Sequence, residues 1–195
     1  MGSNKTVFFI IGILLVVLGV FMLVPYVVQL IYNENSNSFL ASSIITIFIG
    51  ILIVLINLKK DNQLNLQQAF LFSVLAWVSV AIFGCLPFMF SSLKLSFIDA
   101  FFESMSGITT TGSTVILDLD SSPKSILIWR AIMQWLGGIG IIVMATTVLP
   151  LLKVGGMQLF KTDSSGTEKI LPKTIEVATT IISIYLVLTI LCGSI

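Results

Sequence analysis

Long apolar stretches separated by short polar connections make up most of the chain. A membrane-spanning helix needs about 20 mostly apolar residues to cross the ~30 Å hydrocarbon core of a bilayer. The pattern predicts four stretches of that length and a fifth that is only just long enough, at residues 7–32, 39–58, 69–90, 125–152 and 174–191. We therefore expect an all-α polytopic membrane protein.

The first apolar stretch has two interpretations. Lys5 precedes it, as in a secretory signal peptide, but the apolar part of a signal peptide ends after about 15 residues. Residues 7–32 continue without charge beyond that length, and no small-residue cleavage site follows. We interpret them as a membrane helix, kinked or ended near Pro25, that forms an antiparallel hairpin with residues 39–58. Gly84 and Pro87 are expected to loosen or end the third helix.

A shorter segment lies between the third and fourth spans. Residues 96–114 read SFIDAFFESMSGITTTGST, which is a short, largely apolar helix followed by a Thr-rich turn with one glycine. Clusters of Thr, Ser and Gly alone usually mark an ordinary turn. Placed between a short helix and two membrane spans, the cluster instead favours the re-entrant hairpin of an ion pore.

The turn has the residues that a cation filter needs. A dehydrated potassium ion requires rings of oxygen atoms in place of its water, and backbone carbonyls supply them. Thr110, Thr111, Gly112 and Ser113 are the predicted filter, with the carbonyls of the first three as potassium ligands. Aiming successive carbonyls alike requires some left-handed backbone, which glycine adopts most readily. The negative C-terminal end of the short helix would point toward the same ion.

Two charged residues are the predicted supports of this filter. Glu103 either holds the filter loop by accepting hydrogen bonds from backbone N–H groups, which we favour, or adds charge at the ion's entrance. Arg130, near the outer end of the fourth span, is either an electrostatic element beside the ion path or a structural residue. We favour the structural role, in which it reaches the interface or pairs with Glu103 or a filter-loop carbonyl. Close packing is the favoured role of Gly137, Gly138 and Gly140, with a hinge as the alternative.

Composition excludes several other classes. The chain is 56% hydrophobic and 10% charged, with a net charge of +1, no histidine and two cysteines. This balance gives no sign of nucleic-acid binding. Cys85 and Cys192 each lie inside an apolar span, so neither a disulfide framework nor a metal site is indicated. A membrane enzyme would need a polar constellation at membrane depth, where the spans offer only Arg130, hydroxyls and backbone; we expect no enzyme and no cofactor.

Basic residues indicate the orientation in the membrane. A cytoplasmic N-terminus places most of the lysines inside, as the positive-inside rule requires, and the filter hairpin then enters from the outer face. The predicted inner lysines are Lys5, Lys59, Lys60, Lys153, Lys161, Lys169 and Lys173. An acidic outer vestibule is expected from Glu34, Asp99, Glu103, Asp118 and Asp120, although acidic outer loops are common.

Three motifs resemble the Trk/Ktr potassium-uptake family. They are FFESMSGITTTGSTV at residues 101–115, SILIWRAIMQWLGGIGIIV at residues 125–143 and LPLLKVGGMQLFKTDSSG at residues 149–166. The hairpin ahead of them is similar to the Trk type. The resemblance implies four consecutive units of outer helix, pore helix and inner helix around one potassium-channel-like pathway in the cell inner (cytoplasmic) membrane. It also implies a homodimer of the full-length protein and a cytosolic nucleotide-binding regulatory subunit, with residues 153–173 as its docking loop.

The resemblance gives a division of the chain. It implies an N-terminal transmembrane hairpin at 1–62, a first pore unit at 63–153, a cytoplasmic loop at 154–173 and the first helix of an incomplete second unit at 174–195. Within the first unit, the outer helix is 69–90, the pore helix 96–107, the filter 108–114 and the inner helix 125–152. Either the chain is a fragment of a longer protein, which we favour, or several copies assemble.

Potassium uptake through a backbone-carbonyl filter is the function that this resemblance implies, with K⁺ as the transported ion. Channel filters carry two glycines and an aromatic residue, whereas this turn has Gly112 alone and Ser113 in the aromatic position. We therefore expect modest discrimination against sodium. A weakly selective K⁺/Na⁺ pathway and a non-conducting membrane scaffold are the alternative hypotheses.

Overall fold

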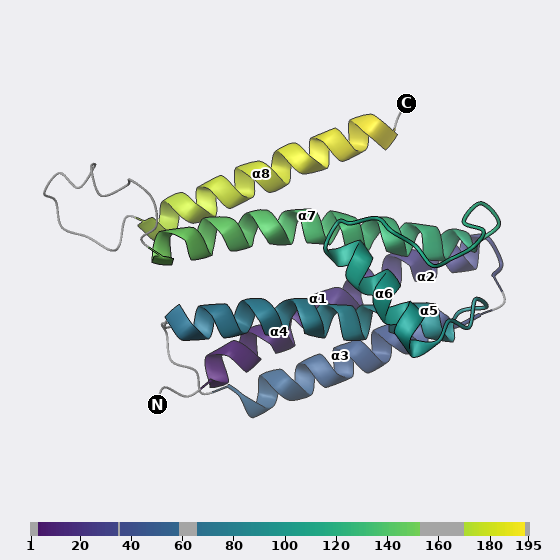
Figure 1. The fold of residues 1–195 in the computed structure, drawn as a ribbon, viewed down its shortest axis with the longest axis horizontal. Helices are drawn as coiled ribbons and strands as arrows, with labels where there is room; N and C mark the ends of the chain where they lie inside the picture. Colours follow the sequence, from purple (N-terminus) through teal and green to yellow (C-terminus); the bar gives the residue numbers. More distant parts are fainter. Residues whose placement is uncertain (1–3, 35, 59–65, 153–169, 194–195) are drawn as a thin grey trace, which may run out of the picture. The chain divides into compact units, whose positions relative to one another are not determined.

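The structure is a computed structural model that describes residues 4–34, 36–58, 66–152 and 170–193. The chain separates into two compact units, Met1–Gly138 and Ile139–Ile195. All regular secondary structure in the described residues is helical, and Figure 1 shows the helices of the first unit. The expected cytoplasmic loop lies largely outside the described residues, as do Lys59 and Lys60.

The helices follow the apolar pattern closely. They are α1 (Lys5–Phe21), α2 (Leu23–Ile31), α3 (Ser38–Ile56), α4 (Leu66–Gly84), α5 (Leu86–Phe90), α6 (Phe97–Ile108), α7 (Lys124–Leu152) and α8 (Ile170–Gly193). Four helical stretches among the described residues are long and apolar enough to cross a membrane: Lys5–Ile31, Ser38–Ile56, Gln67–Phe90 and Lys124–Ile142. Thr179–Gly193, within α8, is a shorter apolar helix. The predicted class, an all-α polytopic membrane protein, is confirmed.

Proline accounts for the two interruptions within these spans. The first span breaks at Met22, between α1 and α2, three residues before Pro25. A proline ring clashes with the carbonyl four residues earlier and offers no N–H to it, so the break precedes the proline. Pro87 has the same effect on the third span, where α4 ends at Gly84 and α5 begins at Leu86.

Close backbone contact joins the N-terminal helices α1 and α3. A Cβ atom on Gly50 would lie 2.9 Å from the Gly12 carbonyl oxygen and 2.9 Å from the Val16 nitrogen. Ser43 strengthens the contact, because its hydroxyl donates to the Gly19 carbonyl of the other helix at 2.7 Å. With no hydrophobic effect between helices in lipid, small residues and interhelical hydrogen bonds provide the attraction.

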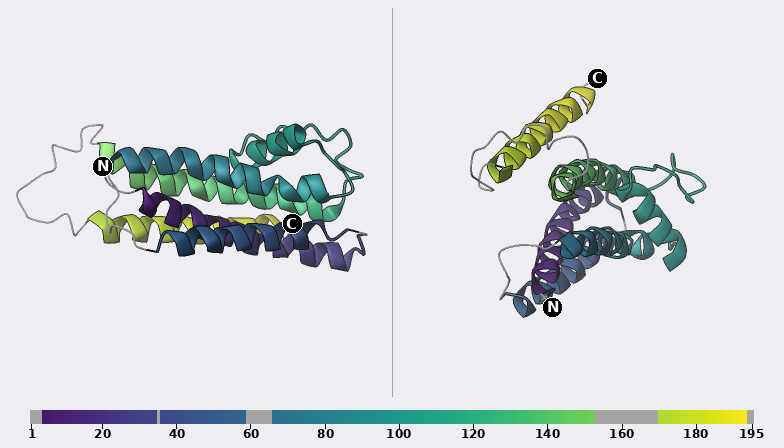
Figure 2. Two further views of the ribbon diagram at one scale, coloured as in Figure 1. Left: turned by 90° about the horizontal axis from the view of Figure 1, so that it is seen from below. Right: turned by 60° about the vertical axis from the view of Figure 1, so that its left-hand side comes forward.

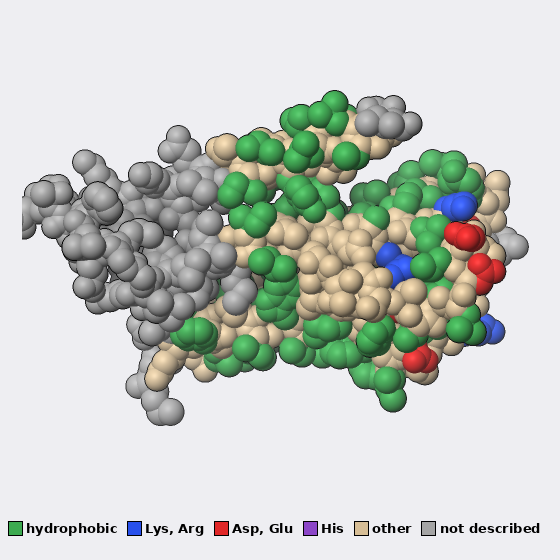
Figure 3. Space-filling view, turned by 45° about the horizontal axis from the view of Figure 1, so that its top comes forward, with side chains coloured by type: hydrophobic (Ala, Val, Ile, Leu, Met, Phe, Trp, Pro, Cys, Tyr) green, Lys and Arg blue, Asp and Glu red, His purple; other side chains and the backbone are tan. Residues whose placement is uncertain are grey.

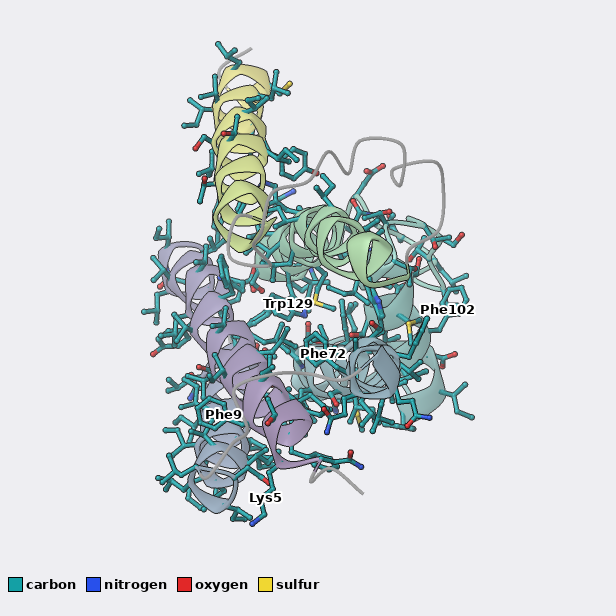
Figure 4. All side chains as sticks on the ribbon, turned by 90° about the vertical axis from the view of Figure 1, so that its left-hand side faces the viewer. Lys5, Phe9, Phe72, Phe102 and Trp129 are labelled. Atoms are coloured by element: carbon teal, nitrogen blue, oxygen red, sulfur yellow. The ribbon has the colours of Figure 1, made fainter. Side chains whose placement is uncertain are left out.

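Trp129 fixes α7 against the end of α4. Its side chain is fully buried, and its indole N–H donates to the Gly84 carbonyl at 3.0 Å. That carbonyl is free of the helix because the Phe88 N–H bonds to Cys85 instead. The ring also meets Phe39 of α3 edge to face, with centroids 6.1 Å apart. Figure 4 shows Trp129 directed into the space between the helices.

The short helix α6 lies at one end of the first unit. It contacts α4 and α5, and the left-hand view in Figure 2 shows it beside that end of the helices. Phe102 of α6 is on the outer side, at 44% exposure. The chain that follows α6, residues 109–115, is exposed along its length.

Gly50→Ala tests the packing of the N-terminal helices. The added Cβ meets backbone atoms that cannot rotate away, so overpacking is expected to cost about 1–3 kcal/mol. The matched control is Gly140→Ala, because a Cβ there has no heavy atom of the described residues within 4 Å, which is not the close packing that we favour for this glycine from the sequence. The free energy of unfolding of the control should rise by up to ~1 kcal/mol, because alanine has a higher helix propensity than glycine. The midpoint temperature of thermal unfolding, measured in detergent, should fall for Gly50→Ala and not for Gly140→Ala. Equal midpoints for the two variants would contradict the close contact between α1 and α3.

Candidate functional site

The helix α6 begins at a well-formed cap. The Ser96 hydroxyl accepts a hydrogen bond from the Asp99 N–H at 3.2 Å, and it donates to the Asp99 carboxylate at 2.7 Å. A serine before the first turn and an acidic residue within it are both favourable at a helix N-terminus. The observed helix, Phe97–Ile108, lies within one residue of the short helix expected from the sequence.

After α6 the backbone alternates between ordinary and left-handed conformations. The φ angles of Thr110 and Gly112 are +58° and +79°, whereas Thr111 and Ser113 have no positive φ. The turn is closed by amides that bond back to the helix, since the N–H groups of Thr111 and Gly112 both donate to the Ser106 carbonyl, at 3.0 and 3.3 Å. The backbone of the turn therefore alternates in handedness, and its role as a filter stays a prediction.

The carbonyl oxygens of the turn fall into two groups. The Ser113 carbonyl accepts a hydrogen bond from the Ser106 hydroxyl at 2.6 Å and is therefore directed back toward α6. Among the described residues, no hydrogen bond is formed to the carbonyls of Thr110, Thr111 or Gly112. These three oxygens are the atoms predicted to bind potassium, and Ser113 differs from them because its carbonyl is occupied.

Glu103 holds the chain that returns from the turn. Its side chain is fully buried, and its Oε1 accepts hydrogen bonds from the Thr114 hydroxyl at 2.5 Å and the Val115 N–H at 2.6 Å. The other oxygen, Oε2, lies 3.0 Å from Nε of Arg130. One carboxylate thus connects α6, the returning segment and α7. This arrangement corresponds to the structural roles that we favour for both residues.

The first half of α7 forms the wall beside the turn. Gly137 permits the closest approach, because a Cβ there would lie only 1.9 Å from the Ile108 carbonyl oxygen. A Cβ on Gly107 would likewise lie 3.0 Å from the Cβ of Met133. The side chain of Gln134 reaches Gly112, and sequence reasoning missed it. The signal was present, since it is an amide inside a strongly apolar helix, one turn after Arg130.

Acidic residues near this end mostly serve as caps and clamps. Glu34 accepts from the N–H of Ser125 at 3.1 Å and from its hydroxyl, so the connection between α2 and α3 caps α7. Asp118, outside the spans, accepts from the hydroxyl and N–H of Ser121, and these bonds lower the pKa of its carboxyl. Figure 3 shows the visible acidic side chains at one end of the first unit. The expected vestibule stays a prediction.

These features define a class: a helical membrane protein in which a short helix and a left-handed turn pack against a longer helix. The family model described as "TrkH: Cation transport protein" matches residues 35–195. The chain therefore belongs to the TrkH family of cation transport proteins, as the sequence resemblance predicted. It is embedded in a membrane through its apolar helices.

Named relatives agree with this assignment. The chain is 41% identical over 189 residues to the Trk system potassium uptake protein TrkH of Escherichia coli (strain K12). The matched region covers 94% of this chain and 39% of that protein. It is 39% identical over 194 residues to the protein of that name from Vibrio parahaemolyticus, covering 97% and 40%. The crystal structure of the potassium transporter TrkH from Vibrio parahaemolyticus superposes with a TM-score of 0.83 at 38% identity, over 96% of this chain and 38% of that chain. The chain thus spans about two fifths of the length of these relatives.

Glu103→Ala tests the clamp. Removing one partner of a buried ion pair is expected to cost about 3–5 kcal/mol, because Arg130 then keeps an uncompensated charge. Glu103→Gln retains an acceptor for Val115 and should cost less. The measurement is thermal unfolding of the complete protein in detergent.

The control for the clamp is Asp99→Asn. Asp99 is only partly buried and belongs to the cap of α6, so this variant should lose no more than about 1 kcal/mol. If Glu103→Ala unfolded at the same temperature as Asp99→Asn, the clamp would not contribute to stability.

Proposed function

We propose that this chain contributes a selectivity filter to a potassium-uptake pathway, with the carbonyl oxygens of Thr110, Thr111 and Gly112 as ion ligands. The observation that supports the proposal is the combination of alternating φ angles with three carbonyls that accept no hydrogen bond from the described residues. A partly dehydrated cation supplies the partner that such oxygens need at membrane depth.

Transport in this proposal is passive and involves no covalent step. The ion exchanges part of its water for peptide oxygens, and the negative end of α6 stabilises it as it does so. The arrangement needs a stiff backbone around the turn. Glu103 and Ser106 provide this, because each bonds to the returning segment from inside α6.

The filter is expected to discriminate only modestly against sodium. Gly112 is the one glycine of the turn, and the Ser113 carbonyl is bonded to Ser106 rather than free to face an ion. Fewer carbonyls are then available to replace the hydration shell. This observation keeps a weakly selective K⁺/Na⁺ pathway as the second candidate function.

The proposal extends to the complete protein through its relatives, which are named potassium uptake proteins. The described chain would form the first of four similar units around one pathway in the cytoplasmic membrane, with its N-terminus in the cytoplasm. A homodimer and a cytosolic nucleotide-binding regulatory subunit are the expected assembly partners, and residues 153–173 the expected docking loop.

The experiment is potassium uptake by cells that lack their own uptake systems, comparing Gly112→Ala and Gly112→Asp with the unchanged protein. A left-handed conformation costs a residue with a Cβ about 1–2 kcal/mol, so Gly112→Ala should reduce uptake roughly tenfold. Gly112→Asp should abolish it. Sodium uptake in liposomes separates the selective from the weakly selective pathway.

Gly140→Ala again serves as the control, since it adds the same methyl group where no atom of the described residues lies within 4 Å. The amount of each variant in the membrane must match. Normal potassium-limited growth with Gly112→Asp would contradict the proposal and support a non-conducting scaffold.

A further inference from the structure

Gln134 is a polar residue at membrane depth that the filter proposal does not use. It lies ten positions after the start of α7 at Lys124, which is about 15 Å along a helix and thus near the middle of the ~30 Å hydrocarbon core. A polar side chain there is costly unless it has a partner, so its presence calls for a functional explanation.

The side chain of Gln134 lies directly against the filter glycine. Its Nε2 is 3.5 Å from the position that a Cβ atom on Gly112 would occupy. Apart from the glycine and its two neighbours, no other heavy atom of the described residues lies within 4 Å of that position. One carboxamide group therefore bounds this flank of the turn. A carboxamide can also be placed turned over, with its nitrogen and oxygen exchanged. Either its N–H donor or its carbonyl acceptor therefore faces Gly112.

Gln134 shares a helix face with two residues that contact α6. Arg130, Gln134 and Gly137 stand at positions i, i+4 and i+7 of α7, which lie on one side of a helix. Arg130 pairs with Glu103, and Gly137 admits the Ile108 carbonyl. Gln134, the middle residue of the three, faces Gly112 of the turn.

The carboxamide also keeps unused hydrogen-bonding capacity. An amide side chain can donate two hydrogen bonds and accept two, yet Gln134 forms none with the described residues and is only partly buried. The carboxamide next to Gly112 is therefore available to bind water or to influence a cation held by the turn. A purely packing role would be served equally well by leucine.

We propose that Gln134 is a selectivity-determining residue of the ion pathway, whose carboxamide influences the cation held at the carbonyls of Thr110, Thr111 and Gly112. This inference rests on the proposed function. It adds a side chain from the inner helix to a site that otherwise consists of backbone oxygens.

The experiment measures rubidium and sodium uptake by the complete protein with Gln134→Leu and Gln134→Glu. Gln134→Leu keeps the volume and removes the amide; it should raise the KM for rubidium several-fold and lower the rubidium-to-sodium preference. Gln134→Glu is nearly isosteric and adds a negative charge close to the ion. It should lower the KM roughly five- to tenfold, since a charge several ångströms from a cation is attractive even when partly screened.

Gln29→Leu is the matched control. Gln29 is a buried amide on α2, bonded to Ser36 and Ser38 rather than to the filter. Its substitution should alter the amount of folded protein but leave KM and ion preference unchanged. Circular dichroism and expression level check that both Gln134 variants fold.

The outcomes separate this inference from the proposed function. Loss of uptake with Gly112→Asp together with unchanged KM and preference in both folded Gln134 variants would overturn the role of Gln134 alone. Uptake that is insensitive to Gly112→Asp would overturn the proposed function, and the role of Gln134 with it. Opposite KM changes in the leucine and glutamate variants would support both.

Discussion

Peptide groups inside a bilayer have no water to bond with, and this constraint governs each place where the chain leaves the helical conformation. At the break before α5, the freed Gly84 carbonyl is taken by the Trp129 indole. After α6, the amides of Thr111 and Gly112 return to Ser106, and Glu103 takes the Val115 amide. The carbonyls of residues 110–112 are among the groups of this exposed turn that accept no hydrogen bond from the described residues. In the proposed function, a cation is the partner of these three oxygens.

The supporting wall depends on small residues at defined points. Gly137 allows the α7 backbone to touch the end of α6, where even a methyl group would overlap the Ile108 carbonyl. The same short separation lets Arg130 reach Glu103 and brings Gln134 to Gly112. The Arg130–Glu103 ion pair and the Gln134–Gly112 contact on this face of α7 therefore both depend on the close approach of the two helices at Gly137. Any ion selection by the turn is coupled to the distance between two helices.

Sequence reasoning predicted the elements well and their contacts unevenly. Span lengths come from apolar runs, and the start of α6 comes from the Ser96 cap, both of which are local signals. The Trp129 bond to Gly84 joins residues 45 positions apart, so no local pattern predicts it. The capping roles of Glu34 and Asp99 were not predicted, and the acidic vestibule expected from these residues stays a prediction. Charge in a sequence shows which groups are available, whereas their partners depend on the packing of distant segments.

Location of the ion tests the central claim most directly. The measurement is the anomalous scattering of thallium or rubidium in crystals of the complete protein. The account predicts a peak within coordination distance of the carbonyl oxygens of Thr110, Thr111 and Gly112, which sodium replaces weakly. A turn that faces lipid, or that is covered by protein with no ion peak beside these oxygens, would contradict it.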